Sequence, residues 1–509
     1  MSDVKVTPDL VYKELCNLNS QKAAGPDDIK PIVLKSCARS LAAPLSVLFR
    51  KTLDEGRLPE DWKTAKITPI FKKGSRRLAC NYRPVSLTSQ VCKLLERIVR
   101  AQITDHLELN NLFSEHQHGF TSKKSCQSNL LESLEEWSEA LDNDLDLDII
   151  FLDFKKAFDT VPHERLIKKL KSYGIVSKIS DWIGDFLRGR TQQVCVGDGL
   201  SEWGQVKSGV PQGSVLGPML FLLYVNELPE LVKSGIKLFA DDTKIYRTIK
   251  GEEDTQALQD DLDVLSRWSE DWMLDFNIDK CKVMHCGRRN QGATYTLTQD
   301  GLVHQLKTTD QEKDLGVLVE NTLKPTLHCH QSANKAAAAL RRIRKAFVDF
   351  DSSSFRMLYT TYVRPHLEYC MQAVGPYMVQ DFKVLEKIQR RATKLVRGLK
   401  NVPYEDRLKR LKIYDMKRRL LRGDLILVFK IMRGMTRLDF NKFFEENAGE
   451  RTRGHNKKLK VKRARHKPRA MTFSRRTIQH WNSLPQDVIQ AETVDSFKNR
   501  LDQHWENDH

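Results

Sequence analysis

The sequence has no apolar stretch long enough to cross a membrane, and its N-terminus lacks the apolar segment of a secretion signal. The longest apolar run covers residues 219–225, whereas a membrane-spanning helix needs about 20 apolar residues. The first residues, MSDVKVTPDL, are mostly polar or charged. We therefore expect a protein that is neither secreted nor inserted in a membrane.

The sequence also lacks paired cysteines. Its ten cysteines are scattered and no CxxC occurs, which argues against a disulfide framework or a zinc ribbon and favours a reducing compartment. Residues 281–286 and 328–330 combine cysteine with histidine, but neither group has a matching second half. We interpret both groups as accidental. No internal repeat is visible.

Acidic residues are absent from residues 451–476, which contain twelve Lys and Arg. We interpret this segment as a mobile basic connector. Its part 457–467, KKLKVKRARHK, fits a nuclear import signal, an RNA-binding segment or a solvated linker equally well. Over the whole chain, 84 Lys and Arg against 66 Asp and Glu give a net charge of +18. This charge favours a polyanionic partner, nucleic acid before an acidic membrane, over a basic protein without one.

The chain is 509 residues long, which suggests about three folded units, and its 40% hydrophobic content supports a sizeable core. Residues 1–60 read as helices broken by loops, strands and helices then mix to about residue 320, and the rest is helical and basic. This order predicts an α+β fold. The expected strands are 64–73, 148–154 and a hairpin at 237–246, and the expected helices include 84–107, 130–141, 163–173 and 258–272.

Three carboxylates stand out on these expected strands. Asp153 ends an apolar strand, and Asp241 and Asp242 occupy the turn of the hairpin. If both elements belong to one sheet, the carboxylates converge, and such a cluster is costly unless a hard cation lies between them. Mg²⁺ prefers these oxygen ligands. The Asp-Asp pair taken alone is more typical of a solvated turn.

Further segments give these carboxylates a context. Eight segments in this order resemble the motifs of reverse transcriptases, most of all those of jockey-like non-LTR retrotransposons, and WNSLP (481–485) resembles the C-terminal part of the same clade. The eight are KITPIFKKG (66–74), NYRPVSLTSQVCKLLERI (81–98), QHGF (117–120), FLDFKKAFD (151–159), SGVPQGSVLGP (208–218), FADD (239–242), NIDKCKVM (277–284) and KDLGV (313–317).

The sequence departs from the family pattern at several points. Ala240 stands in FADD where retroviral enzymes have Tyr-x-Asp-Asp, Thr121 follows Gly-Phe where Arg is frequent, and Cys281 replaces a frequent Thr. No retroviral-type RNase H motifs are visible after residue 320. The chain begins at the polymerase, without the endonuclease expected upstream in an intact element. We therefore expect a fragment or the remnant of a degraded copy.

The resemblance implies a right-hand polymerase fold, with fingers, palm, helical thumb and a basic, mostly helical C-terminal extension. The expected boundaries follow the composition. They are 1–60 for an N-terminal helical extension, 61–320 for fingers and palm, 321–435 for a helical thumb or connector, and 436–509 for the basic C-terminal segment.

The resemblance also implies roles for single residues. Asp153, Asp241 and Asp242 would hold two Mg²⁺ ions, with Asp242 also ordering the turn. Lys280 would protonate the departing pyrophosphate, unless it is an ordinary surface lysine. Leu315 and Gly316 would belong to the primer grip.

A further set would bind the nucleotide. Phe158 would be the steric gate under the sugar, unless it is a core aromatic residue, and Phe154 precedes it in the same motif. Arg83 would clamp the triphosphate. We interpret Asp159 as a local cap. The remaining candidates are Gln212 and Gly213 in the glycine-rich loop, and Lys66, Lys72 and Lys73, which are equally well solvated or in contact with the template.

The implied function is an RNA-directed DNA polymerase that takes an RNA template, a DNA primer or RNA–DNA hybrid, and dNTPs. No membrane and no obligate protein partner is inferred, and the expected location is a nuclear or cytoplasmic ribonucleoprotein. Two alternatives stay open. One is a group II intron-type reverse transcriptase with maturase function, and the other is an inactive remnant that only binds nucleic acid.

Overall fold

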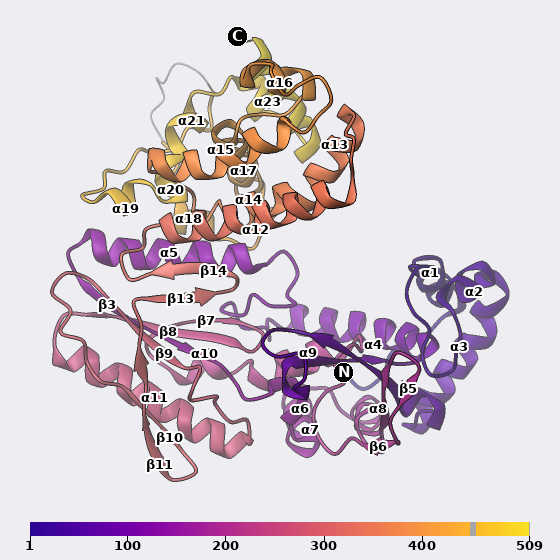
Figure 1. The fold of residues 1–509 in the computed structure, drawn as a ribbon. Coiled ribbons are helices and arrows are strands. Elements are labelled where there is room, and N and C mark those ends of the chain that lie inside the picture. Colours follow the sequence, from indigo (N-terminus) through magenta and orange to yellow (C-terminus); the bar gives the residue numbers. More distant parts are fainter. Residues whose placement is uncertain (448–454, 508–509) are drawn as a thin grey trace.

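The structure is a computed structural model, and it describes residues 1–447 and 455–507. Two bodies lie one above the other (Figure 1). The lower body holds the N-terminus and the strands, and the upper body is built from helices that follow residue 325. This arrangement confirms the predicted mixture of helices and strands.

The right-hand part of the lower body in Figure 1 surrounds a small sheet. Its elements are α1 (Pro8–Cys16), α2 (Pro31–Ser36), α3 (Ala38–Glu55), β1 (Thr64–Phe71), β2 (Tyr82–Leu87), α4 (Gln90–Leu109), α6 (Ala157–Thr160), α7 (His163–Ser172), α8 (Lys178–Leu187), β4 (Thr191–Val196), β5 (Gly199–Leu200) and β6 (Gly204–Gln205). β1 pairs antiparallel with β2 and parallel with β4. The helices before β1 share one hydrophobic core with α4 and α8, so residues 1–60 pack against the segment that follows them.

A central sheet occupies the other part of the lower body. Its strands, in spatial order, are β12 (Lys307–Thr308), β9 (Lys282–Cys286), β3 (Asp146–Leu152), β8 (Asp242–Ile249) and β7 (Gly235–Phe239). The helices around it are α5 (Cys126–Asp142), α9 (Gly217–Val225), α10 (Leu228–Leu231) and α11 (Glu252–Trp272), and two separate hairpins follow, β10 (Thr296–Gln299) with β11 (Leu302–Gln305) and β13 (Gln311–Asp314) with β14 (Val317–Glu320).

The buried strand β3 supplies two hydrophobic cores, one on each face of this sheet. Ile150 and Leu152 belong to the core that contains α11, whereas Ile149 and Phe151 belong to the core that contains α5. Successive side chains of a strand point to opposite faces, so a run that is apolar at every position is buried on both. The segment 148–154, an apolar run bracketed by acids, is confirmed as a buried strand, which spans Asp146–Leu152 in the structure.

The expected helix 84–107 begins later than predicted. Residues 82–87 form β2, whose register with β1 runs from Lys66 opposite Leu87 to Phe71 opposite Tyr82. Pro84 cannot donate to a strand ladder and is tolerated at its edge. α4 then starts at Gln90, behind the cap that Ser89 provides.

The upper body contains the rest of the described chain. Its helices are α12 (Thr326–Ala346), α13 (Ser352–Leu358), the π-helix η3 (Tyr359–Val363), α14 (Arg364–Glu368), α15 (Val379–Thr393), α16 (Tyr404–Leu411), α17 (Met416–Met432), α18 (Phe440–Phe443), α19 (Lys467–Ala470), α20 (Phe473–Arg476), α21 (Ile478–Asn482), α22 (Gln486–Ile489) and α23 (Val494–Asn507). α12 to α16 surround a third hydrophobic core. The predicted helical character after residue 331 is confirmed.

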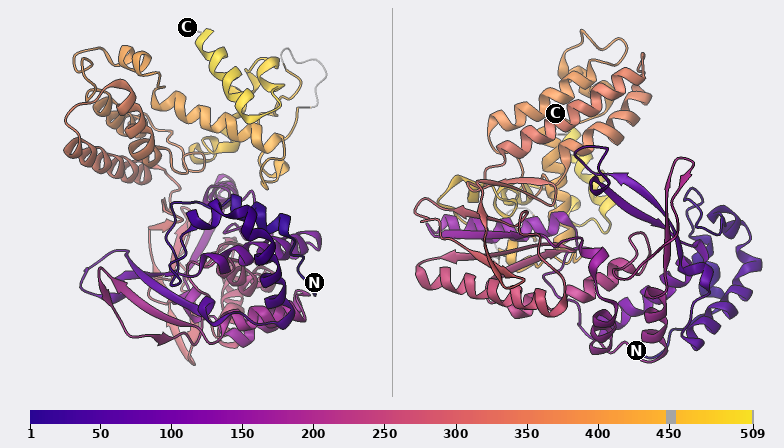
Figure 2. Two further views of the ribbon diagram at one scale, coloured as in Figure 1. Left: turned by 90° about the vertical axis from the view of Figure 1, so that its right-hand side faces the viewer. Right: turned by 60° about the horizontal axis from the view of Figure 1, so that its bottom comes forward.

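The interpretation of residues 451–476 as a mobile connector is wrong for the part that the structure describes, which begins at residue 455. Arg469 is buried and its guanidinium lies 2.8 Å from the carboxylate of Glu135 on α5. Leu459 and Phe473 are buried in the core that α5 shares with the central sheet. The further views show these C-terminal helices beside α5 (Figure 2). The high density of Lys and Arg predicted a solvated segment. In the structure, contacts with α5 and with the shared core hold the segment in place. Residues 451–454 lie outside the described part.

Two further findings concern the expectations on membranes and cysteines. Within residues 1–447 and 455–507, no helix is long and apolar enough to cross a membrane. All ten cysteines are free thiols.

Candidate functional site

The register of the central sheet brings the three predicted carboxylates to one edge. β3 pairs antiparallel with β8, and the last pair of this register is Leu152 opposite Thr243. Asp153 directly follows Leu152 and Asp242 directly precedes Thr243, so both lie at the end of the paired strands. Asp241 lies in the turn before β8, after Ala240, whose φ of 58° makes the turn tight. The predicted convergence of Asp153 with this hairpin is thus present in the structure.

Electrostatics at this edge reflect the crowding of like charges. Loss of hydration raises the pKa of Asp241, and the charge of Asp153 raises it further. Loss of hydration also raises the pKa of Asp242 to about 7, reinforced by the charges of Asp241, Asp314 and Asp153. Carboxylates that resist ionisation in this way gain most from a bound cation.

Lys280 supplies a positive charge at this edge. The register of β3 with β9 ends with Phe151 opposite Lys282. Asp153 lies two residues after Phe151 and Lys280 two residues before Lys282, so both continue from the same end of the pair. The Lys280 Nζ donates to the Asp153 Oδ2 at 2.5 Å. In the described part of the chain, no three His, Cys, Asp or Glu side chains converge closely enough to hold a metal ion as they stand. The donor chemistry fits Mg²⁺, and the Lys280 ammonium occupies one of the carboxylate oxygens that an ion would use.

A cleft of about 290 Å³ opens beside these groups. Asp153, Asp242 and Lys280 line it together with Lys73 and Leu315, so residues from five separate motifs share one space. Leu315 and Gly316 form the two-residue turn between β13 and β14, and both have positive φ, 47° and 86°. The predicted primer-grip segment therefore faces the carboxylate edge.

The glycine-rich loop lies against β2 on the other side of the site. The Ser86 N–H donates to the Gln212 carbonyl at 2.7 Å. Gly213 has φ 118°, and a Cβ there would lie 2.5 Å from the Ser86 carbonyl oxygen. Glycine is required at this position by both the backbone conformation and the close approach. Arg83, exposed on β2, is near enough for its charge to oppose the rise in the pKa of Asp241.

Asp159 differs from its predicted role as a local cap. Its carboxylate accepts a hydrogen bond of 2.7 Å from the Gln212 side chain, and its backbone carbonyl accepts one from Ser208. The helix that follows, α7, is capped by Pro162 without a side-chain bond. Asp159 thus orients Gln212, because a carboxylate can only accept the amide N–H.

Two aromatic residues after Asp153 occupy different environments. The Phe158 ring is half-buried and stacks on Phe221, with 4.5 Å between ring centroids. Phe154 is 2% exposed and stacks on Phe276 at 4.7 Å. The Phe154 ring therefore belongs to the core, and the predicted nucleotide contact at this position stays a prediction.

The basic residues of the first motif also separate. Lys66 is half-buried, and its Nζ lies 3.6 Å from Asp28. Lys72 is exposed, and its backbone N–H donates to Asn81. Lys73 is exposed and is the one of the three that lines the carboxylate cleft.

Comparison with known proteins relates these motifs to a family. The family described as "Reverse transcriptase (RNA-dependent DNA polymerase)" matches residues 70–324, half of the chain, which include the carboxylate edge and the glycine-rich loop. The chain belongs to the reverse transcriptase family.

Curated relatives match most of the length of this chain. It is 26% identical over 430 residues to the probable RNA-directed DNA polymerase from transposon X-element of Drosophila melanogaster, covering 81% of this chain and 47% of that protein. It is 26% identical over 412 residues to the RNA-directed DNA polymerase from mobile element jockey of the same species, covering 78% and 44%. The chain thus spans about half the length of the curated relatives it matches.

Sequence reasoning missed a buried ion pair in the wall of this cleft. The Lys244 Nζ on β8 contacts the Asp314 carboxylate at the end of β13, and both residues are buried. Burial lowers the pKa of Lys244, and Asp314 opposes that change. The pair ties the hairpin that carries Leu315 to the strand that carries Asp242. The two residues lie 70 positions apart, so no local sequence pattern could have predicted that they form a pair.

Proposed function

We propose that this chain is an RNA-directed DNA polymerase of a non-LTR retrotransposon, which copies RNA into cDNA by nucleotidyl transfer. The observation that carries the proposal is the β3–β8 register, whose last pair, Leu152 opposite Thr243, places Asp153 and Asp242 next to each other at one sheet edge within the family-matched segment. The names of the matched relatives support it, since they are RNA-directed DNA polymerases of mobile elements.

The proposal includes a right-hand arrangement. Residues 61–320 form fingers and palm, with the central sheet as the palm and β1 and β2 in the fingers. Residues 321–435 form the helical thumb or connector, 1–60 an N-terminal helical part, and 436–509 the basic C-terminal segment. The separation into a strand-containing lower body and a helical upper body supports this assignment (Figure 1).

Asp153 and Asp241, with Asp242 beside them, would hold two Mg²⁺ ions. The ions supply the means to activate a primer 3′-hydroxyl and to neutralise charge on pyrophosphate. The raised pKa values of Asp241 and Asp242 support the assignment, because mutual repulsion favours binding of a cation. The Lys280 ammonium would leave Asp153, contact the departing pyrophosphate and donate a proton to it.

The other residues would position the nucleotide. Arg83 would bind the triphosphate, since guanidinium suits bidentate phosphate contact. Gln212, oriented by Asp159, would contact the nucleotide or template, and Gly213 would hold the loop against β2. Phe158 would lie beneath the sugar. Lys73 in the cleft is a better candidate for phosphate contact than Lys66, which pairs with Asp28.

The substrates would be an RNA template, a DNA primer or RNA–DNA hybrid, and dNTPs. Leu315 and Gly316 would hold the primer end at the cleft. The excess of Lys and Arg suits phosphate backbones, where affinity depends on charge more than on base sequence. The chain would work in a nuclear or cytoplasmic ribonucleoprotein.

Primer extension on an RNA template tests the proposal. The full chain with Mg²⁺ and dNTPs should lengthen a labelled DNA primer, and a chelator should stop the reaction. The double variant Asp153→Asn/Asp241→Asn is the matched control for contaminating polymerases. Binding of template–primer without extension would instead favour the inactive remnant, and splicing of a group II intron by the chain would favour the maturase.

A further inference from the structure

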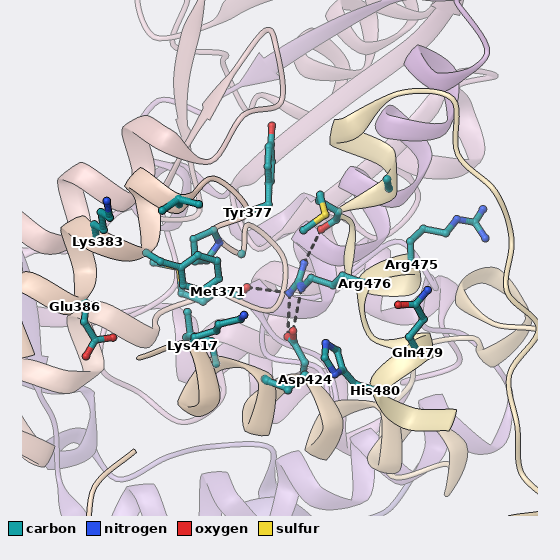
Figure 3. A pocket seen from close by; sticks show the side chains of 18 of the residues that line it. Met371, Tyr377, Lys383, Glu386, Lys417, Asp424, Arg475, Arg476, Gln479 and His480 are labelled. Atoms are coloured by element: carbon teal, nitrogen blue, oxygen red, sulfur yellow. Dashed lines mark hydrogen bonds and ion pairs between the residues drawn. The ribbon is translucent and has the colours of Figure 1, made fainter. Parts of the chain in front are cut away.

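The upper body contains a cavity of about 950 Å³ that the polymerase proposal does not use. It lies between α15, α17 and the C-terminal segment that includes α20 and α21 (Figure 3). In Figure 3, Lys383 on α15 stands on one side, Arg476 and His480 on the other, and Lys417 on α17 between them. All lining residues fall within 371–480, outside the family-matched segment.

The charge around this cavity is strongly positive. Seven Lys and Arg line it against two acids, Glu386 and Asp424. Both acids are engaged within the protein. Asp424 accepts two hydrogen bonds of 2.9 Å from Arg476, and Glu386 accepts from the Met416 N–H at 2.8 Å and from the Tyr404 hydroxyl. They cannot neutralise the remaining cations.

Three of these cations have no counter-charge. Lys383, Lys387 and Lys417 are exposed, and none of their side chains forms an ion pair or hydrogen bond with any part of the chain that the structure describes. They come from two helices, α15 and α17, that meet at the same cavity. Unpaired lysines around one opening create a field that attracts a phosphate chain rather than a single small ion.

The interior offers a surface for flat rings. Met371 and Leu420 contribute buried apolar walls, and Tyr377 stands at the edge of the space with its hydroxyl directed away from the lysine side (Figure 3). Burial raises the pKa of Tyr377 to about 12, so its hydroxyl stays neutral. Burial and the charge of Lys417 lower the pKa of His480, which leaves a neutral imidazole able to donate and accept at a base edge.

We propose that this cavity binds an unpaired segment of RNA, with a base inserted beside Tyr377 and the flanking phosphates on Lys383, Lys387 and Lys417. Unstacked bases on aromatic side chains, with a basic groove along the backbone, are the usual way of holding single strands. The volume is near the upper end of ligand pockets and admits more than one ring. The choice of RNA over DNA rests on the proposed function, which places an RNA template on this protein.

Photo-crosslinking locates the site. A single-stranded RNA of about 12 nucleotides, within the range of single-strand binding sites, carries 4-thiouridine and is mixed with the full chain without Mg²⁺ or dNTPs. An excess of unlabelled template–primer hybrid blocks the polymerase cleft. We expect crosslinks in peptides that contain Tyr377 or His480. Crosslinks confined to residues 61–320, or equal crosslinking of a DNA strand of the same sequence, would overturn the proposal.

Binding measurements test the chemistry. Under the same block, the variant Lys383→Ala/Lys387→Ala/Lys417→Ala should lower the slope of log affinity against log salt by about 2, since each contact to a single strand contributes about 0.7. The control Lys13→Ala/Lys168→Ala/Lys171→Ala, which removes as many exposed lysines from α1 and α7, should keep the wild-type slope. Equal slopes for both triple variants would refute the phosphate contacts.

The inserted base has its own test. Tyr377→Leu should weaken RNA binding about tenfold, in line with the usual contribution of one base on an aromatic side chain. Unchanged affinity in a variant with wild-type thermal stability would refute the insertion. If Tyr377→Leu is unstable, the surface triple variant decides. Primer extension by the wild-type chain is measured in parallel. If the wild-type chain binds RNA in this cavity but does not extend a primer, the polymerase proposal is contradicted and the RNA site is not.

Discussion

The carboxylate edge of the central sheet and the basic cavity of the upper body both gather like charges, but they compensate them differently. At the sheet edge, Asp153 already has a partner, the Lys280 ammonium at 2.5 Å. At the cavity, Lys383, Lys387 and Lys417 have none among the described residues, because both nearby acids are engaged elsewhere. A site with an internal counter-charge can exchange it during a reaction, whereas a site without one is suited to continuous binding of a polyanion.

Of the variants that test this comparison, those that remove a carboxylate from the sheet edge should have the largest effect, which is on primer extension. Asp153→Asn or Asp241→Asn should each reduce primer extension by at least about 10²–10³-fold, because charge stabilisation at the reacting phosphate is lost. Binding of template–primer should change little, since its affinity comes mainly from phosphate contacts. Single-turnover extension and filter binding measure the two quantities. Substantial extension by either variant in Mg²⁺ would show that the site is misassigned.

Removing the internal counter-charge comes next. Lys280→Ala should slow single-turnover incorporation by roughly 10²-fold, the lower end for a general acid, with a smaller change in nucleotide affinity. Lys280→Arg keeps the charge beside Asp153 but donates a proton far less readily, so it should stay slow. Wild-type rates in both variants would make Lys280 an ordinary surface lysine.

Sugar selection should change less. Phe158→Val should open space beneath the nucleotide and raise the use of rNTP relative to dNTP by about 5- to 150-fold, which corresponds to a packing penalty of 1–3 kcal/mol. The stacking of Phe158 on Phe221 favours the competing role as a core residue. That role predicts a less stable protein with unchanged preference. The ratio of kcat/KM for a matched rNTP and dNTP separates the two.

The smallest expected effect is on the pH dependence of the free energy of unfolding, to which each body contributes one buried histidine. Burial lowers the pKa of His118, which contacts β7 and α5, and of His328, at the start of α12, from 6.5 to about 4. The unfolded chain therefore binds more protons between these values, and stability present above pH 6.5 is lost as the pH falls toward 4. Each histidine should contribute up to about 1.4 kcal/mol per pH unit in that window.

Urea unfolding at several pH values measures this slope. His118→Gln and His328→Gln should each flatten it by a similar amount, and the double variant should flatten it further. A slope that neither variant alters would mean that other groups control acid unfolding in both bodies.

Much of the carboxylate site was predictable from the sequence, because its geometry follows from strand register. Asp153 ends a continuous apolar run and Asp241-Asp242 interrupts an alternating hairpin, so pairing the two elements sets the distances among the acids. The order of the eight motifs then indicated the family, and its match over 70–324 confirmed it. Lys280 was predicted too, although its contact with Asp153 needed β9 to lie next to β3.

Tertiary structure alone decided the remaining features. The stacking of Phe154 on Phe276 and the contact of the Asp159 carboxylate with Gln212 were not predicted, because the relative positions of these residues are not encoded in spacing. Residues 455–476 looked solvated by charge, yet Arg469 is buried against Glu135, 334 positions away. A sequence pattern reports the periodicity of one element at a time. Which distant element supplies the partner charge, or leaves three lysines without one, depends on how helices pack, and that is decided only in the folded chain.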